Sequence, residues 1–369
     1  MKNIYAFRLL IMLICLLTLS FITKQKEQIP ATATGIENVY QDGLFDSDDI
    51  LEITLKGNVR DLLKNRTGNP KLFPFVLSYK KEDSSRADIP IEARTRGHFR
   101  RLPGNCQFPP ILLQFKKEGA QQHTIFSEQK KLKLVMPCAG EEYVIREWLT
   151  YKIYNLVTPF SFRARLVKVN LEDEENKKPI EPFYGMLLEE EKQMAQRNHT
   201  AIVKKKMRPE QIQTEAFNKM AVFQYLIGNT DWSVQYQQNI KLITPDSGLT
   251  TIAVPYDFDH AGLVNAPYAK PAEELRMSSI RQRRYRGYCV QDLSKFNDVL
   301  AEYRRQKDEV LKLFTSCTLL DQKFLKSNSQ WLEEFYNTIN DDKSWQKDFA
   351  YPCDKNGTGN VVIRGLKED

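Results

Sequence analysis

The chain has 369 residues, of which 41% are hydrophobic, so it can bury a substantial core as one large domain or two lobes. Lysine and arginine number 54 and aspartate and glutamate 47, a net charge of +7 spread over both signs. This balance suits a phosphate-bearing ligand or an acidic surface. A dedicated nucleic-acid binder would show a concentrated basic face, so no nucleic acid is expected as a partner.

The N-terminal segment, residues 1–33, is typical of a signal peptide or an N-terminal anchor. Lys2 and Arg8 precede an apolar run over 9–22, which is shorter than the about 20 residues that span a bilayer. Small residues at 31–33 offer a cleavage site. We expect the chain to be exported to the periplasm or cell envelope, or to be associated with the membrane through this segment.

Five cysteines lie outside the apolar run, and some can pair in an oxidising compartment. Their odd number leaves at least one free or paired between chains, and the connectivity cannot be deduced from sequence. Cys106 and Cys138 lie beside strand-like runs. These positions are equally compatible with a disulfide between the two cysteines and with a buried free thiol. No CxxC motif or Cys/His cluster is present, so a zinc site is not expected. The five residues are Cys106, Cys138, Cys289, Cys317 and Cys353.

Residues 34–190 are predicted to form a β-rich N-terminal lobe. Short apolar runs separated by glycine, proline or charged turns start at 49–58 and predict an antiparallel sheet. The spacing then changes to that of an amphipathic helix over 142–157, which ends before Thr158 and Pro159. Two further strand-like runs follow this helix.

Residues 191–369 are predicted to form a helical C-terminal lobe. A long helix is expected over 208–229, with Pro209 near its start and Gly228 at its end. A β-hairpin over 238–259 follows, and three helix-like segments begin after residue 290. The order of elements matches a two-lobed α+β fold of the kinase-like kind.

Asp231, Asn239, Asp257 and Asp259 lie around the two ends of the predicted hairpin. Phosphoryl transfer needs a metal-binding carboxylate and a second carboxylate that orients the attacking hydroxyl, and Mg²⁺ accepts carboxylate and amide oxygens. In that interpretation Asp231 is catalytic, Asn239 and Asp257 bind the metal, and Asp259 assists. Asx turns that close the hairpin explain the same residues equally well.

Five segments carry a family resemblance when taken in chain order. They contain an Arg-Gly turn followed by a strand, a helix with its following strand, a Tyr-Gly–aliphatic–Glu segment, a Gly-Asn-x-Asp loop and an aromatic-Asp-x-Asp motif. Together, across about residues 85–265, they resemble the spore-coat protein H family of atypical kinases, and the Gly-Asn-x-Asp loop also resembles that of secretory-pathway kinases. The segments are 91–117, 144–170, 184–191, 226–231 and 254–262.

The resemblance assigns further residues to nucleotide binding. Arg96 and Gly97 would form the turn over the phosphates, where glycine permits close backbone approach and arginine a bidentate grip. Lys133 would bind phosphate and pair with Glu147 of the helix, as in protein kinases. Glu189 lies in the segment that would offer backbone groups to adenine.

The sequence departs from the family pattern in three places. Pro109–Pro110 stands where the family has two lysines, which leaves Lys116 as an alternative to Lys133. Trp232 stands where related loops often carry arginine, and the spacing between Asp231 and Asn239 is longer than in protein kinases.

The resemblance implies an exported atypical kinase that uses ATP with Mg²⁺ or Mn²⁺ and phosphorylates a hydroxyl of a protein. ATP is scarce outside the cytoplasm, so a phosphate donor other than ATP is an alternative. Two alternatives are a sugar or small-molecule phosphotransferase and a catalytically silent module that binds a protein or an envelope glycan. The silent module would use the Arg/Tyr run at 280–288 as its interaction surface.

Overall fold

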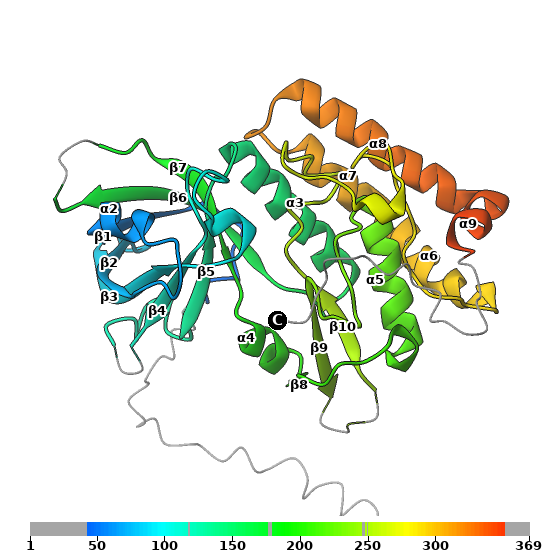
Figure 1. Cartoon of the computed structure of the whole chain (residues 1–369), viewed down its shortest axis with the longest axis horizontal. Helices are drawn as coiled ribbons and strands as arrows, with labels where there is room; N and C mark the ends of the chain where they lie inside the picture. The colour runs from blue at the N-terminus through cyan, green and yellow to red at the C-terminus, as the bar shows by residue number, and fades with distance from the viewer. Residues whose placement is uncertain (1–42, 117–118, 176–178, 246–247, 249, 351–369) are drawn as a thin grey trace, which may run out of the picture. The chain divides into compact units, whose positions relative to one another are not determined.

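A closed β-barrel and a mostly helical region make up a mixed α+β fold (Figure 1). The computed structural model describes residues 43–116, 119–175, 179–245, 248 and 250–350. The predicted signal segment and Cys353 lie outside these residues. Within the described ranges, no helix has the length and apolarity needed to cross a membrane.

The barrel contains seven strands in the order β1-β2-β3-β4-β5-β7-β6, and β1 closes it by pairing in parallel with β6. The other neighbours in the barrel are antiparallel. The sequence predicts the antiparallel strands but not the closure, since alternation shows which face of a strand is buried and not which strand lies beside it. The strands are β1 (Leu51–Gly57), β2 (Phe73–Lys80), β3 (Arg86–Thr95), β4 (Ile111–Phe115), β5 (Lys131–Val135), β6 (Ala164–Asp173) and β7 (Phe183–Leu188).

Two hydrophobic cores meet at one wall of the barrel. The barrel's own core contains Ile53, Leu77 and Ile89, and the short helix α2 (Val59–Lys64) adds Val59 and Leu62 to it. The outer sides of β5, β6 and β7 instead face the second core and contribute residues such as Val135, Leu166 and Met186. These three strands are therefore buried on both faces, and they fix the barrel against the helical region.

The helical region also contains a three-stranded sheet of order β10-β9-β8. The hairpin of β9 and β10 and the helix at 142–157 are confirmed, whereas the helix predicted over 208–229 is shorter and starts at Thr214, where the Gln213 side chain caps it. The elements are α3 (Glu141–Val157), α4 (Glu191–Arg197), β8 (Thr200–Val203), α5 (Thr214–Leu226), β9 (Ile240–Pro245), β10 (Ile252–Pro255), α6 (Asn297–Arg305), α7 (Lys307–Thr315), α8 (Gln322–Asn340) and α9 (Asp342–Phe349). Short 3₁₀ turns are η1 (Phe99–Arg101), η2 (Pro209–Gln211), η3 (Glu273–Leu275) and η4 (Leu293–Phe296).

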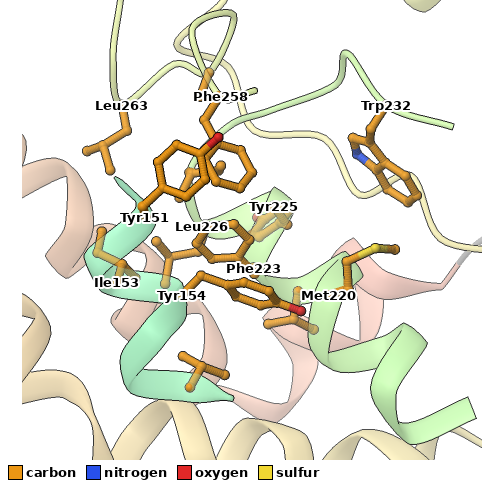
Figure 2. Close-up of a cluster of buried hydrophobic side chains, with 14 of the residues drawn as sticks. Tyr151, Ile153, Tyr154, Met220, Phe223, Tyr225, Leu226, Trp232, Phe258 and Leu263 are labelled. Carbon is orange, nitrogen blue, oxygen red and sulfur yellow. The ribbon is translucent and has the colours of Figure 1, made fainter. Parts of the chain in front are cut away.

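Aromatic rings join α3, α5 and the segment after β10 in the second core (Figure 2). The ring of Phe258 lies 4.6 Å from that of Tyr151 and 5.3 Å from that of Phe223, measured between centroids. Tyr154 stacks on Phe223 at 4.3 Å. Phe258 is fully buried. The chain directly after β10 is therefore anchored between the two helices.

A disulfide between Cys106 and Cys138 ties the loop after β3 to the segment between β5 and α3, with a Cα–Cα distance of 4.4 Å. Of the two alternatives that the sequence leaves open for these cysteines, the bond is the one present. Cys289 is also disulfide-bonded, and Cys317 is a half-buried free thiol.

We expect the Cys106→Ser/Cys138→Ser double variant to lose about 3–4 kcal/mol of unfolding free energy, because the bond closes a loop of 32 residues in the unfolded chain. Urea unfolding under oxidising conditions measures this change. Cys317→Ser serves as the control for loss of a thiol and should leave the midpoint nearly unchanged. A double variant with the wild-type midpoint would contradict the expectation.

Candidate functional site

The β9–β10 hairpin brings Asn239 and Asp257 to the same end of the small sheet. Ile240 pairs with Pro255 at that end, and the Tyr256 N–H donates to the Asn239 carbonyl at 3.0 Å. Both residues therefore lie just beyond the last pair of the ladder. This is the arrangement that the sequence predicts for two residues sharing one ligand.

Asn239 and Asp231 contact each other directly. Asn239 Nδ2 donates to the Asp231 carbonyl at 2.9 Å and to Asp231 Oδ2 at 3.0 Å. The Asp231 N–H in turn donates to Asn229 Oδ1 at 3.0 Å. Since its amide nitrogen is directed at Asp231, Asn239 presents its amide oxygen as the atom that can ligate a cation.

Asp257 has an unusual backbone conformation and is held by two contacts, one through its N–H and one through its carboxylate. Its φ of +63° is left-handed, as is the +51° of Asn239, and such positions in non-glycine residues cluster at functional sites. Its N–H donates to Tyr151 Oη of α3 at 2.9 Å, and its Oδ1 lies 2.7 Å from Lys133 Nζ of β5. The Asp257 side chain is 33% exposed, so a ligand can reach it.

The charge state of Asp257 follows from its neighbours. Burial raises its pKa, but Lys133, followed by Arg100 and Arg96, outweighs burial and lowers the pKa to about 2. Asp257 is therefore ionised at neutral pH and pairs with Lys133. The lysine that contacts Asp257 is Lys133, whereas Lys116 is exposed just beyond the end of β4.

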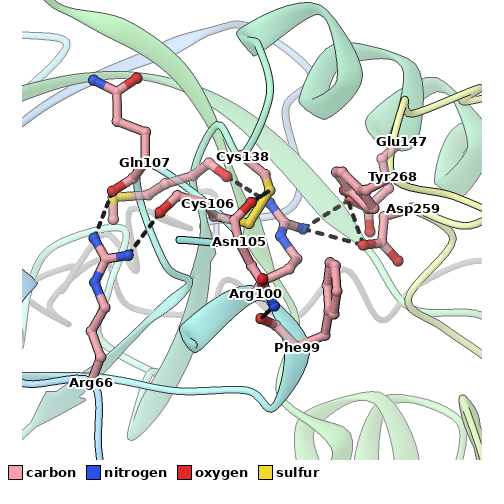
Figure 3. The surroundings of a disulfide bond; sticks show 11 residues. Arg66, Phe99, Arg100, Asn105, Cys106, Gln107, Cys138, Glu147, Asp259 and Tyr268 are labelled. Carbon is pink, nitrogen blue, oxygen red and sulfur yellow. Dashed lines mark hydrogen bonds and ion pairs between the residues drawn. A yellow bond between two sulfur atoms is a disulfide. The ribbon is translucent and has the colours of Figure 1, made fainter. Parts of the chain in front are cut away.

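Glu147 pairs with an arginine that the sequence interpretation did not select (Figure 3). Arg100 Nη1 lies 3.9 Å from Glu147 Oε2 and 3.8 Å from Asp259 Oδ2, and its Nη2 donates to the Met136 carbonyl at 2.6 Å. Of the ion pairs between described residues, none joins Lys133 to Glu147. The Arg100 guanidinium is held by the Met136 carbonyl just after β5 and lies beside Glu147, while Lys133 contacts Asp257.

Glu147 is a buried acid with incomplete partners. Burial, followed by the nearby charges of Asp259 and Asp257, raises its pKa to about 8 despite Arg100 and Lys133. Its Oε1 is buried and finds no hydrogen-bond partner among the described residues. A protonated carboxyl at neutral pH fits this position, since burial disfavours the charged form.

Asp259 belongs to the same network as Arg100. Tyr268 Oη donates to Asp259 Oδ2 at 3.1 Å, and the side chain is nearly buried. Asp257 and Asp259 thus face different partners on either side of Phe258. Of the two, Asp257 is the better placed to meet a ligand.

Arg96 and Gly97 form an exposed turn after β3. The Arg96 N–H donates to the Pro110 carbonyl at 2.9 Å, and Gly97 adopts a φ of +91° with open space where a Cβ would lie. Arg96 is near enough to lower the pKa of Asp257, after the effects of burial, Lys133 and Arg100. The turn therefore lies on the Asp257 side of the site with room around its backbone.

The N–H and carboxylate of Glu189 are engaged inside the protein. Its N–H donates to the Arg163 carbonyl at 3.0 Å, and its Oε2 accepts from the Arg163 N–H at 2.9 Å. Arg197 also forks onto both carboxylate oxygens at 3.0 Å. The Glu189 N–H and side chain are thus structural, and they do not extend toward Asp257.

No group of three or more His, Cys, Asp or Glu side chains that could hold a metal occurs in the part of the chain that the structure describes. The Asp257 carboxylate and the Asn239 amide oxygen are a two-ligand set of hard donors. Mg²⁺ is commonly bound by one or two carboxylates and completed by phosphate and water oxygens. These residues therefore fit a cation that arrives with a phosphate.

The Arg/Tyr run at 280–288 is part of the internal framework. Its guanidinium groups bind backbone carbonyls, many of them on the loop around Asp231 and the helices beside it. Arg286 is buried, whereas Arg284 is exposed, so the run serves the internal framework at its C-terminal end and reaches solvent before it. The carbonyl acceptors are Gly262 O for Arg281, Leu226 O and Trp331 O for Arg283, Leu275 O for Arg284, and Thr230 O and Trp232 O for Arg286.

Sequence reasoning missed Arg100, Tyr151, Tyr268 and Asn229. Arg100 lies within the Arg-Gly segment that carries the family resemblance, but two neighbouring arginines there hid which one turns inward. Tyr151 follows Glu147 by one helical turn, so the 3.6-residue period places both on one face of α3. That spacing was a usable signal. Asn229 lies in the Gly-Asn-x-Asp loop, which was a signal of its own, whereas Tyr268 had none.

We expect Glu147→Gln to flatten the dependence of stability on pH. An acid whose pKa is raised on folding, here from 4.5 to about 8, stabilises the folded state below the unfolded value and loses that contribution as pH rises to the folded value. Wild-type unfolding free energy should fall across this window, and the glutamine variant, which keeps the shape, should remove most of the fall. Urea unfolding at a series of pH values measures it; parallel curves for the two proteins would refute it.

No family model and no curated protein matches the sequence. Among solved structures, the chain is similar to the Helicobacter pylori proinflammatory kinase CtkA, with a TM-score of 0.40 and 10% sequence identity over 68% of this chain and 94% of that chain. A likeness this distant carries no argument about activity. Function is therefore inferred from the contacts of the site itself.

Proposed function

We propose that the chain is an atypical kinase with a two-lobed kinase-like fold, which transfers the terminal phosphate of a nucleotide to a hydroxyl group. The observation that carries the proposal is the Lys133–Asp257 contact at 2.7 Å next to the paired Asp231 and Asn239. These residues come from β5, the end of β10 and both ends of the loop before β9. A cation for phosphate, a carboxylate for metal and a second carboxylate for the acceptor are the parts that phosphoryl transfer needs.

Donor binding would use residues that now neutralise one another. Asp257 and the Asn239 amide oxygen would hold a Mg²⁺ or Mn²⁺ ion, which supplies positive charge to the phosphates when bound. Lys133 would then exchange its contact with Asp257 for one with phosphate oxygens. The exposed Arg96–Gly97 turn would cover the phosphates, since its backbone is open to close approach. ATP with Mg²⁺ or Mn²⁺ is the proposed donor.

Asp231 would orient the acceptor and take its proton. Burial raises the pKa of Asp231, with a smaller opposing effect from His260, so its carboxylate is a better base than one in water. The hydroxyl oxygen would form a bond to the γ-phosphorus while the bond between that phosphorus and the β–γ bridging oxygen breaks. The nucleoside diphosphate leaves, and the hydroxyl proton moves to Asp231. Asn239 keeps Asp231 in place through Oδ2.

Export remains part of the proposal. The Cys106–Cys138 bond supports it, because structural disulfides persist in oxidising compartments and are rare in the cytosol. The acceptor is proposed to be a hydroxyl on a protein. A sugar or other small molecule would use the same charged residues, and an acceptor screen separates the two.

Asp257→Ala tests the donor site. Wild-type protein should gain about 2.7 kcal/mol of stability at a Mn²⁺–ATP concentration of roughly 100 times Kd, and the variant should gain almost none. Thermal unfolding with and without Mn²⁺–ATP measures this difference. Asp88→Ala, an exposed acid on the barrel, is the matched control and should keep the wild-type shift. A wild-type protein that no nucleotide stabilises would favour the silent module.

Asp231→Asn tests the acceptor role. Loss of a general base costs about 10²–10⁴-fold in turnover, while the amide keeps the shape and the contact with Asn239. We therefore expect the Mn²⁺–ATP stabilisation to persist and phosphate transfer to fall by that factor. Transfer is measured as labelled phosphate incorporated into an acceptor. Full turnover in the variant would exclude Asp231 as the base.

A further inference from the structure

Arg286 binds the carbonyls of the residues before and after Asp231. Its Nη1 donates to the carbonyl of Thr230 and, at 2.8 Å, to the carbonyl of Trp232. Thr230 and Trp232 are each 3% exposed, and Arg286 is 7% exposed. One buried guanidinium therefore bridges the two residues that flank the proposed base.

These contacts satisfy groups that would otherwise be costly. Buried carbonyls in folded proteins nearly always have a hydrogen-bond partner, and a charged donor makes the stronger bond. The guanidinium carbon also lies 5.6 Å from the Trp232 ring centroid, within the range of a cation–π contact. Loss of the guanidinium would leave both buried carbonyls without this donor. Because an unpaired buried carbonyl is unfavourable, we expect the loop to rearrange.

The geometry constrains Asp231 in particular. Each peptide unit is planar, so fixing the carbonyl of residue 230 orients the peptide that precedes Asp231, and fixing that of residue 232 orients the peptide that follows Trp232. Together they limit the conformations of the backbone at residue 231 and the direction of its side chain. Asn229 already holds the Asp231 N–H, and Asn239 holds its carbonyl and Oδ2. Arg286 adds a constraint from a segment more than fifty residues away in the chain.

The segment that carries Arg286 is itself fixed. Arg281 donates to the Gly262 carbonyl at 3.1 Å and to Asn328 Oδ1 of α8 at 2.7 Å. Arg283 donates to the Leu226 carbonyl at the end of α5 at 3.1 Å and stacks over Trp331, 3.6 Å from the ring centroid. Arg281 and Arg283 are thus two separate anchors of the segment that carries Arg286, so removal of one leaves the other in place.

We propose that Arg286 is a positioning residue for Asp231, which sets the orientation of that carboxylate toward the acceptor hydroxyl. The inference rests on the proposed function, since it is the phosphoryl transfer for which Asp231 is positioned. Arg286 acts through the backbone of the loop and not by contact with the nucleotide. Its removal should therefore affect transfer and not donor binding.

The test compares Arg286→Met with Arg283→Met, which removes a matched, largely buried guanidinium from carbonyls elsewhere. Full-length chain is labelled with 5-fluorotryptophan at its four tryptophans, and Trp232→Phe and Trp331→Phe assign two of the fluorine resonances. Arg286→Met should shift the Trp232 resonance and leave that of Trp331, and Arg283→Met should do the reverse. Thermal unfolding confirms that both variants are folded.

The functional test measures two quantities separately, the rate of phosphate transfer and the stability gained from Mn²⁺–ATP. Arg286→Met should lower turnover about 100-fold, the scale expected when a catalytic group is displaced by about 1 Å, with an unchanged stability gain from Mn²⁺–ATP. Arg286→Lys should recover part of the turnover, because an ammonium can still donate to both carbonyls. Arg283→Met should keep most of it.

Two results would overturn the inference. One is a Trp232 resonance that stays in place in Arg286→Met, which would mean that the loop does not depend on the guanidinium. The other is an equal loss of turnover in the Arg283 and Arg286 variants. If the wild-type chain transfers no phosphate, the proposed function fails and the positioning role with it, while the Trp232 resonance still decides whether Arg286 holds the loop.

Discussion

The burial of one ring, Phe258, positions the charged residues of the candidate site. The ring is fully buried against Tyr151 and Phe223, and such burial contributes about 1.5–3 kcal/mol. Phe258 is fixed in the core, and the carboxylates next to it in the chain contact different cations, Asp257 meeting Lys133 and Asp259 meeting Arg100. Hydrophobic packing between α3 and α5 thus sets where the carboxylates lie, and the ion pairs adapt to it.

Two cations and three acids lie around Phe258, and the two cations differ in how closely they contact the acids. Lys133 stabilises ionised Asp257, while Arg100 lies at longer range from both Glu147 and Asp259. The direct pair is compatible with partial exposure of Asp257, and the long pairs are not hydrogen bonds. The site therefore combines one tight contact, between Lys133 and Asp257, with a buried carboxyl, Glu147, whose raised pKa favours the neutral form.

Local patterns in the sequence predicted α3, the β9–β10 hairpin and the residues at its end, because periodicity and turn residues act over a few positions. The closure of the barrel through β1 and β6 was not predictable, since no local signal encodes which distant strands pair. The pairing of Arg100 with Glu147 was missed for the same reason. Long arginine side chains reach across elements, so Arg100, Arg197 and Arg286 find acceptors that residue spacing cannot reveal.

The parallel pairing of β1 with β6 also sets an order for folding. Leu51 meets Val167, so the first strand has no neighbour on that side until β6 has been made and has folded back. Pairing across so long a loop is slow, and the unpaired edge is exposed to aggregation in the meantime. The Cys106–Cys138 bond lies within this loop and shortens the chain that must close. An oxidant that acts early in folding would therefore raise the yield of native protein.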